Sequence, residues 1–350
     1  MSVPAVVYAP GALGSNPGKT ANDLVIYDGL WFKIVAVVDP SNAGRDAGEV
    51  VGVGRKGIPV VPSLEDAFRF NPKAFIIGVA PVGGVIPESW MSDIRLALAN
   101  GLDVYSGMHV FLSDNKELVE IAERYGARIY DVRKPGRELF RIWDGSVLRT
   151  GCTRILVAGT DCCVGKNIAC IELYKELERR GVKTGVVGTG QTMLLLGAKG
   201  AVIDAIPADF TPGVVERFVV EACNGGCKTV VVEGQGAILH PAYGQVTLSI
   251  LYGASPTHIV LCHHPGRKMR TEFEGIPMPE PEEEAEMLLQ LNPYKKAKLA
   301  GLCINTTGMS KDEAARWKKE LEERLRAPVV DPLRDGVNVI VDTILENTES

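Results

Sequence analysis

A chain of 350 residues is long enough for two domains of ordinary size. Its composition, 46% hydrophobic and 23% charged, is typical of a soluble globular protein. The net charge of −5 gives no electrostatic reason to expect binding to nucleic acid or to an anionic membrane. No apolar run approaches the ~20 residues of a membrane-spanning helix, and the N-terminus lacks the features of a signal peptide. We therefore expect a cytoplasmic protein without membrane or nucleic-acid partners.

The eight cysteines lie mostly in apolar segments, and without an export signal we expect them to be reduced thiols. The adjacent pair Cys162 and Cys163 does not have the spacing of a zinc site, and neither does the pair Cys223 and Cys227. We therefore expect no metal site among the cysteines.

The first half of the chain alternates short apolar runs with segments of helical spacing, which predicts a parallel sheet. A glycine-rich turn at residues 9–20 separates the first strand from a second that ends at Asp39, as in a Rossmann unit, although the glycine fingerprint is incomplete. A loop at residues 80–84 follows another strand, at the position where open α/β sheets bind ligands. The order of elements around residues 57–67 resembles the CoA-binding domains of acyl-CoA ligases. Whether this half binds a ligand or serves as a scaffold is left open.

Residues 133–152 are basic and loop-like, and they include an Asp-Gly turn. We place the domain boundary here, with a Rossmann-like domain over residues 1–145 and a P-loop nucleotide-binding domain over residues 146–350.

The second half begins with an apolar strand at residues 155–158, a glycine-bounded loop and a helix, which is the order that a phosphate-binding loop requires. Backbone N–H groups and the helix N-terminus face the anion, and the lysine reaches the outer phosphates. The residues expected to bind phosphate are Gly159, Thr160, Asp161, Val164, Gly165, Lys166 and Asn167.

This loop departs from the usual phosphate-loop pattern in two ways. Five residues separate Gly159 from Gly165 instead of four, and Asn167 stands where a Ser or Thr hydroxyl normally binds Mg²⁺. The longer spacing resembles dethiobiotin synthetases, which read Gly-Thr-x-x-x-Val-Gly-Lys-Thr. Phosphate binding is therefore expected, whereas metal-assisted phosphoryl transfer is in doubt.

An apolar strand at residues 229–232 ends in Glu233, which is the Walker B arrangement and matches the Val-Glu-Gly of dethiobiotin synthetases. Gln235 could bond to a substrate, and His240 could act as an acid or base near pH 7. We treat Glu233 and His240 as candidate catalytic residues, with a loop-packing role for His240 as the alternative.

Three further residues follow the ends of predicted strands. Gln191 lies in a polar loop beside the expected phosphates, and Arg267 could clamp a substrate carboxylate in a bidentate pair. Asn305 stands where dethiobiotin synthetases carry an asparagine that reads adenine. We expect Gln191, Gln235 and Arg267 to bind substrate.

The whole chain resembles a two-domain family long described as of unknown function. The marks are Gly-Thr-Asp-Cys-x-Val-Gly-Lys at residues 159–166 and Glu-Gly-Gln-Gly-x-x-x-His-Pro at residues 233–241. The resemblance implies an α/β fold, with a Rossmann-like parallel-sheet domain followed by a P-loop NTPase-like domain similar to dethiobiotin synthetase. Some members are described as D-glutamate N-acetyltransferases, which implies acyl transfer from acetyl-CoA to an amino acid.

Two alternatives remain open from the sequence. The first is an ATP-dependent ligase or kinase-like enzyme of dethiobiotin-synthetase type, for which Mg²⁺ would be needed. The second is a non-catalytic nucleotide sensor. The ligand of the loop is accordingly acetyl-CoA or ATP, the partner is a small-molecule substrate, and we expect a homo-oligomer.

Overall fold

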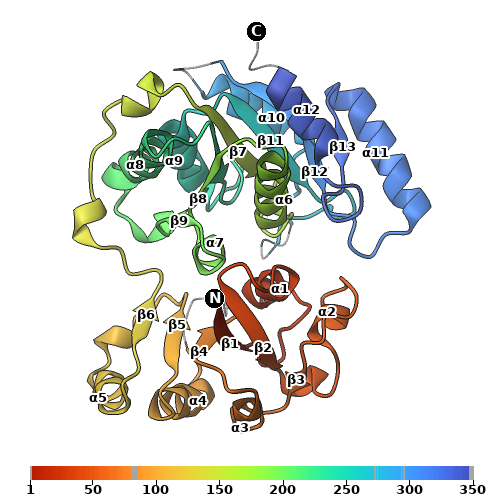
Figure 1. Cartoon of the computed structure of the whole chain (residues 1–350). Helices are drawn as coiled ribbons and strands as arrows, with labels where there is room; N and C mark the ends of the chain where they lie inside the picture. Colours follow the sequence, from red (N-terminus) through yellow and green to blue (C-terminus); the bar gives the residue numbers. More distant parts are fainter. Residues whose placement is uncertain are drawn as a thin grey trace. The chain divides into compact units, whose positions relative to one another are not determined.

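The computed structural model describes residues 2–79, 86–271, 273, 275–292, 294 and 296–346, so the loop expected at residues 80–84 lies outside it. The chain divides into two compact units (Figure 1). The first comprises residues 1–135 together with residues 191–198, and the second comprises residues 136–190 and 199–350. The boundary suggested by the sequence, at residue 145, lies a little further along the chain. The sequence does not predict that residues 191–198 belong to the first unit.

The first unit is built on a six-stranded sheet in the order β3-β2-β1-β4-β5-β6, with every pairing parallel. The strands are β1 (Val3–Tyr8), β2 (Phe32–Val38), β3 (Val60–Val61), β4 (Ala74–Ile77), β5 (Asp103–Ser106) and β6 (Ile129–Asp131). The helices are α1 (Lys19–Ile26), α2 (Ala47–Val50), α3 (Leu64–Ala67), α4 (Glu88–Ala99), α5 (Lys116–Tyr125) and α7 (Gln191–Leu195). This strand order is that of a Rossmann fold.

The core of the first unit follows from strand alternation. Alternate strand residues such as Val6, Phe75 and Val104 pack in one cluster with Leu98 of α4 and Leu118 of α5. Strand β4 is buried along its whole length, as expected for a parallel strand covered on both faces.

The second unit has a seven-stranded parallel sheet in the order β13-β12-β11-β7-β10-β8-β9. Its strands are β7 (Thr153–Gly159), β8 (Thr184–Gly188), β9 (Lys199–Gly200), β10 (Thr229–Glu233), β11 (His258–His263), β12 (Lys298–Ile304) and β13 (Val329–Val330). Its helices are α6 (Lys166–Arg179), α8 (Thr211–Asn224), α9 (Gly244–Ala254), α10 (Pro281–Gln290), α11 (Lys311–Leu325) and α12 (Asn338–Glu346).

Helices cover both faces of this sheet. Helices α8, α9 and α10 contribute to the main apolar cluster with alternate strand residues such as Leu156, Val232 and Leu261. Helices α6 and α12 contact each other and pack on β7, β8, β10 and β12 (Figure 1). Because all strands are parallel, the carboxyl ends of β7, β8, β10, β11 and β12 meet at one edge, where open α/β sheets bind ligands. The expected fold class is confirmed.

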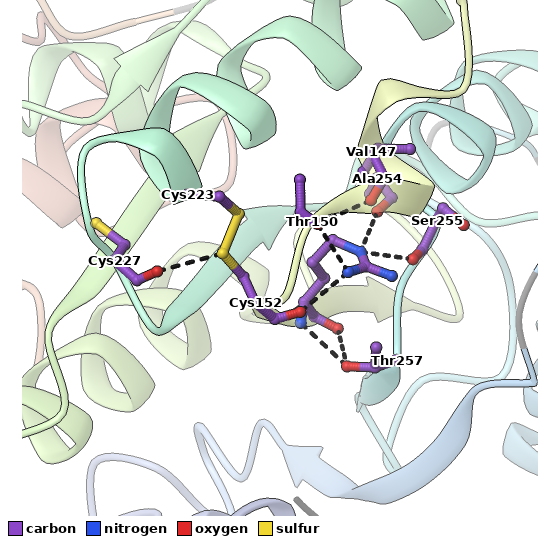
Figure 2. Close-up of a disulfide and its surroundings, with 9 residues drawn as sticks. Val147, Thr150, Cys152, Cys223, Cys227, Ala254, Ser255 and Thr257 are labelled. Atoms are coloured by element: carbon purple, nitrogen blue, oxygen red, sulfur yellow. Dashed lines mark hydrogen bonds between the residues drawn. A yellow bond between two sulfur atoms is a disulfide. The ribbon is translucent and has the colours of Figure 1, made fainter.

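The opposite end of β7 is anchored by a buried arginine, Arg154. Its Nε donates to the carbonyl oxygens of Ala254 and Ser255, at 3.2 and 2.9 Å, and so satisfies the last carbonyls of α9. Nearby, Cys152 and Cys223 form a disulfide (Figure 2). The expectation that all cysteines are reduced is therefore wrong for this pair. The two residues are 71 positions apart, and they meet because α8 packs on β8 and β10, and β10 pairs with β7.

Among the described residues, none of the helices combines the length and the apolar character needed to cross a membrane.

Candidate functional site

Glycines shape the loop between β7 and α6. Gly165 has a φ of +102°, which favours glycine, and α6 begins at the next residue, Lys166. A Cβ on Gly159 would lie 2.8 Å from Cγ2 of Val164, so the loop closes tightly over the end of β7. The N-terminus of a 14-residue helix therefore faces a compact turn, which is an arrangement suited to an anion.

Lys166 is the buried cation of this turn. Its side chain is almost fully buried, and its Nζ donates to the carbonyl oxygens of Asp161 and Gly236, at 2.7 and 3.0 Å. Within the described part of the chain, no carboxylate forms an ion pair with it. Because the acceptors in contact with this buried ammonium are neutral carbonyls, its charge has no contact partner of opposite sign, and the site favours an incoming anion.

Asp161 is fully buried and surrounded by positive groups. Its Oδ2 accepts from the backbone N–H of Thr271 at 2.9 Å and from Nη1 of Arg267 at 3.2 Å. Nη1 of Arg270 lies 3.7 Å from its Oδ1. The segment after β11 is thereby tied to the phosphate loop.

Arg267 lies against the phosphate loop itself. Besides Asp161, it donates to the carbonyl oxygens of Cys162 at 2.7 Å and Cys163 at 3.2 Å. A substrate carboxylate would have to share the guanidinium with these acceptors. Its expected role as a carboxylate clamp stays a prediction.

Arg270 is a site residue that the sequence analysis did not single out. It is 6% exposed, and it donates to the carbonyl oxygens of Thr160 at 3.1 Å and Leu239 at 2.9 Å. It therefore joins the phosphate loop to the loop after β10. A single arginine in a proline- and acid-rich stretch carries no local signal for such a role.

His240 is buried, and its hydrogen bonds indicate which nitrogen carries the proton. Nδ1 accepts from the N–H groups of Ala242 and Tyr243, at 3.1 and 3.2 Å. The neutral ring therefore carries its proton on Nε2, which lies 3.5 Å from Oδ1 of Asp161. Burial and the neighbouring Arg270 lower the pKa of His240, which keeps the ring neutral near pH 7. In this arrangement Nε2 of His240 carries a proton that it can donate, although it makes no hydrogen bond within the described residues. The role of His240 as a base stays a prediction that needs the other tautomer.

Glu233 ends β10 beside the loop that follows β8. Its Oε2 accepts from the N–H groups of Thr189 and Gly190, at 2.7 and 2.9 Å, and its side chain is buried. The amide of Gln235 donates to the carbonyl oxygen of Thr189. Both residues therefore fix the geometry of the loop after β8 as well as lying near the phosphate loop.

The remaining residues predicted for the site lie on different elements of the structure. Asn167 is buried in the first turn of α6, and the hydroxyl of Thr160 lies 2.9 Å from Nδ1 of His263. Asn305 follows β12 at the same sheet edge, with its Oδ1 accepting from the N–H and hydroxyl of Thr307. Gln191 belongs to the first unit, where its Oε1 accepts from Nη1 of Arg133 at 3.2 Å.

Three potential metal ligands also gather here, since Asp161, Cys162 and His240 each place one donor atom within 4.8 Å of the others. A cation on Nε2 of His240 would require the proton to sit on Nδ1, which already accepts from two N–H groups. The guanidinium groups of Arg267 and Arg270 would repel it further. The donor set therefore does not fit a metal ion well.

Comparisons with known proteins agree with this architecture. Residues 40–135 match the Rossmann-like domain of unknown function DUF1611_N, and residues 141–341 match the P-loop domain of unknown function DUF1611_C. A D-glutamate N-acetyltransferase from Tritonibacter scottomollicae is 36% identical, over 81% of this chain and 84% of the relative. A protein of the same name from a Pseudoalteromonas species is 31% identical, over 80% of this chain and 83% of the relative.

A crystal structure of a DUF1611 family protein from Anabaena variabilis superposes with a TM-score of 0.92 and 28% identity. It covers 99% of this chain and 100% of its own. The resemblance stated from the sequence motifs is confirmed, and the chain belongs to the DUF1611 family, with its Rossmann-like and P-loop domains in the order of that family.

Proposed function

We propose that this protein is an acetyl-CoA-dependent N-acyltransferase that acts on an amino acid such as D-glutamate. The observation that carries the proposal is the buried ammonium of Lys166, held by two carbonyl oxygens at the start of α6. The names of the two relatives supply the reaction class.

The site fits the phosphates of acetyl-CoA better than it fits Mg-ATP. Lys166 and the helix N-terminus favour several negative charges. Asn167 replaces the hydroxyl that normally binds Mg²⁺, and Oε2 of Glu233 is taken by two backbone N–H groups. Phosphates could therefore bind here without a metal ion. Asn305 follows β12, which is separated from β7 by β11 in the sheet, and its amide is our candidate reader of the adenine.

The reaction joins the amine nitrogen to the acetyl carbon, breaks the carbon–sulfur bond and leaves the proton on the CoA thiol. The acetyl group lies at the end of the pantetheine arm. This arm is about as long as four extended peptide residues, which is roughly 14 Å. His240 and Glu233 lie beside the phosphate loop, so they reach the thioester only if the arm folds back. With its proton on Nε2, His240 is better placed to donate to a ligand oxygen than to accept a proton.

The test is release of free CoA thiol when the protein is mixed with acetyl-CoA and D-glutamate, followed by a panel of other amino acids. We expect thiol release to be lost in Lys166→Ala and kept in Lys175→Ala, a change to a half-exposed lysine on the same helix. Mg²⁺-dependent ADP formation from ATP without any thiol release would overturn the proposal in favour of a ligase or kinase-like activity.

A further inference from the structure

Glu284 of α10 is a fully buried carboxylate that neither the motifs nor the proposed reaction uses. Its Oε1 accepts from the N–H of Ile238, and its Oε2 accepts from the N–H of Leu239 at 3.2 Å. Both N–H groups belong to the loop that connects Glu233 to His240. A buried charge is retained at a cost, so its two hydrogen bonds to a motif loop call for an explanation.

Arg270 holds the same loop from the other side. Leu239 gives its N–H to Glu284 and its carbonyl oxygen to Nη2 of Arg270, at 2.9 Å. Nη1 of Arg270 donates to the carbonyl oxygen of Thr160 in the phosphate loop, at 3.1 Å. The backbone of Leu239 therefore connects the buried carboxylate of Glu284 with the buried guanidinium of Arg270, which also contacts the phosphate loop.

We propose that Glu284 and Arg270 are positioning residues that together clamp residues 238–239 against the phosphate loop and so fix His240 opposite Asp161. The proposal rests on the proposed function only for the choice of acetyl-CoA as ligand. Neither residue needs to touch the ligand, because each acts through the backbone of Leu239. Loss of either should loosen the loop that carries His240 and weaken the binding of anions in the phosphate loop.

The ionisation of Glu284 provides an independent readout. Burial raises the pKa of Glu284 to about 7, against the lowering effects of its two backbone hydrogen bonds and of Arg270 and Lys166. On the elements packed around α10, Arg324 of α11 pairs with Glu280 and Glu282. Burial lowers the pKa of His263, at the end of β11, to about 4, so that side chain stays neutral over the pH range in which Glu284 titrates. The clamp should therefore be complete above pH 7 and weaken as Glu284 takes up a proton below it.

The first experiment is a double-mutant cycle with Glu284→Gln and Arg270→Lys, and with Glu286→Gln as the control on an exposed position of the same helix. Calorimetry measures the affinity for acetyl-CoA, and steady-state kinetics measure KM for each substrate. We expect each single change to weaken acetyl-CoA binding about tenfold and to raise its KM without changing KM for the amino acid. The double variant should bind acetyl-CoA at most about threefold more weakly than whichever single variant has the lower affinity. Additive losses, or losses of thermal stability without any change in affinity, would overturn the proposal.

The second experiment follows acetyl-CoA affinity from pH 6 to pH 8 in the natural protein and in Glu284→Gln. The comparison cancels the titration of the ligand phosphates. We expect the natural protein to bind about tenfold tighter than the variant at pH 8 and nearly equally at pH 6. If Glu284 acted only as a negative charge near the anion, the variant would bind more tightly at pH 8, and the positioning role would be wrong.

Hydrogen exchange of residues 236–243 tests the clamp without any ligand. Both single variants should lose amide protection there, and Glu286→Gln should keep it. If the natural protein neither binds acetyl-CoA nor releases thiol, the proposed function fails, and the clamp is still judged by exchange and by inorganic pyrophosphate binding. Unchanged protection in both variants would refute the clamp.

Discussion

Nε2 of His240 lies 3.5 Å from Oδ1 of Asp161, and both side chains are fully buried inside the P-loop domain. Asp161 is also the shared partner of Arg267 and Arg270, at 3.2 and 3.7 Å. One carboxylate in the phosphate loop therefore organises a histidine from the loop after β10 and two arginines from the segment after β11.

The Asp161 charge should be needed for stability. In Asp161→Asn, the amide keeps the shape but leaves the two guanidinium groups without their common counter-charge. Since breaking a buried ion pair is costly, we expect a loss of about 3 kcal/mol in the free energy of unfolding, measured by urea denaturation. Asp209→Asn, on an exposed position, is the control. Equal unfolding midpoints for the two variants would show that the arginines do not depend on Asp161.

Buried histidines should make the protein sensitive to acid. Burial lowers the pKa of both His258 and His263 to about 4 in the folded state. The unfolded chain binds protons at these residues below about pH 6.5, so stability is full above that pH and falls towards pH 4, by about 3 kcal/mol for each residue.

Glu284 has the opposite effect on stability. Its pKa of about 7 in the folded state lies above that of an unfolded glutamate, so its protonation below pH 7 stabilises the folded state. Two histidines outweigh one glutamate. Urea denaturation at a series of pH values should therefore show a net loss on acidification, and His258→Gln should reduce its slope. An unchanged slope in that variant would contradict the assignment of the loss to buried histidine.

In the first unit, Asp39 accepts hydrogen bonds from N–H groups of the glycine-rich turn. Its carboxylate accepts from the N–H groups of Gly11 at 2.8 Å, Leu13 at 3.3 Å and Ser41 at 3.0 Å. We expect NAD and NADP to give no thermal shift, because the glycine turn already holds its own anion. Asp39→Asn should cost about 2 kcal/mol, since charge-assisted hydrogen bonds are lost. A clear rise in melting temperature with either dinucleotide would contradict this interpretation.

Divalent cations should be dispensable for ligand binding. Asn167 has an amide instead of a hydroxyl, and Oε2 of Glu233 already accepts hydrogen bonds from the N–H groups of Thr189 and Gly190. EDTA should leave acetyl-CoA affinity unchanged in calorimetry, and Asn167→Thr should not create Mg²⁺-dependent ATP hydrolysis. A tenfold fall in affinity with EDTA would show that a cation takes part.

The features predicted from the sequence are those encoded by neighbouring residues. The phosphate loop, its helix and the acid at the end of β10 follow from glycine spacing and apolar runs of ordinary length. The partners of Asp161 do not, because Arg267 and Arg270 lie more than 100 positions away. The sequence predicts Arg267 only as a substrate ligand, and no local pattern marks Arg270. In the sequence, Glu284 is one of several acidic residues in a segment predicted to lead into a solvated helix, and only the packing of α10 buries it.

Two further features depended on long-range packing. Residues 189–192 follow a strand of the P-loop domain and are predicted to form a polar loop beside the phosphates, yet the contacts of residues 191–198 place that segment in the first unit. The disulfide between Cys152 and Cys223 joins the start of β7 to the end of α8, and cysteine spacing gave no sign of it.

The proposed function requires the ammonium of Lys166 to bind the phosphates of acetyl-CoA. Calorimetric titration of acetyl-CoA into the natural protein, Lys166→Ala and Lys175→Ala measures this contact. We predict saturable binding that weakens at least about 30-fold in Lys166→Ala, as expected for the loss of a buried charge-assisted contact, and that stays unchanged in Lys175→Ala. Equal affinity in all three proteins would contradict the account.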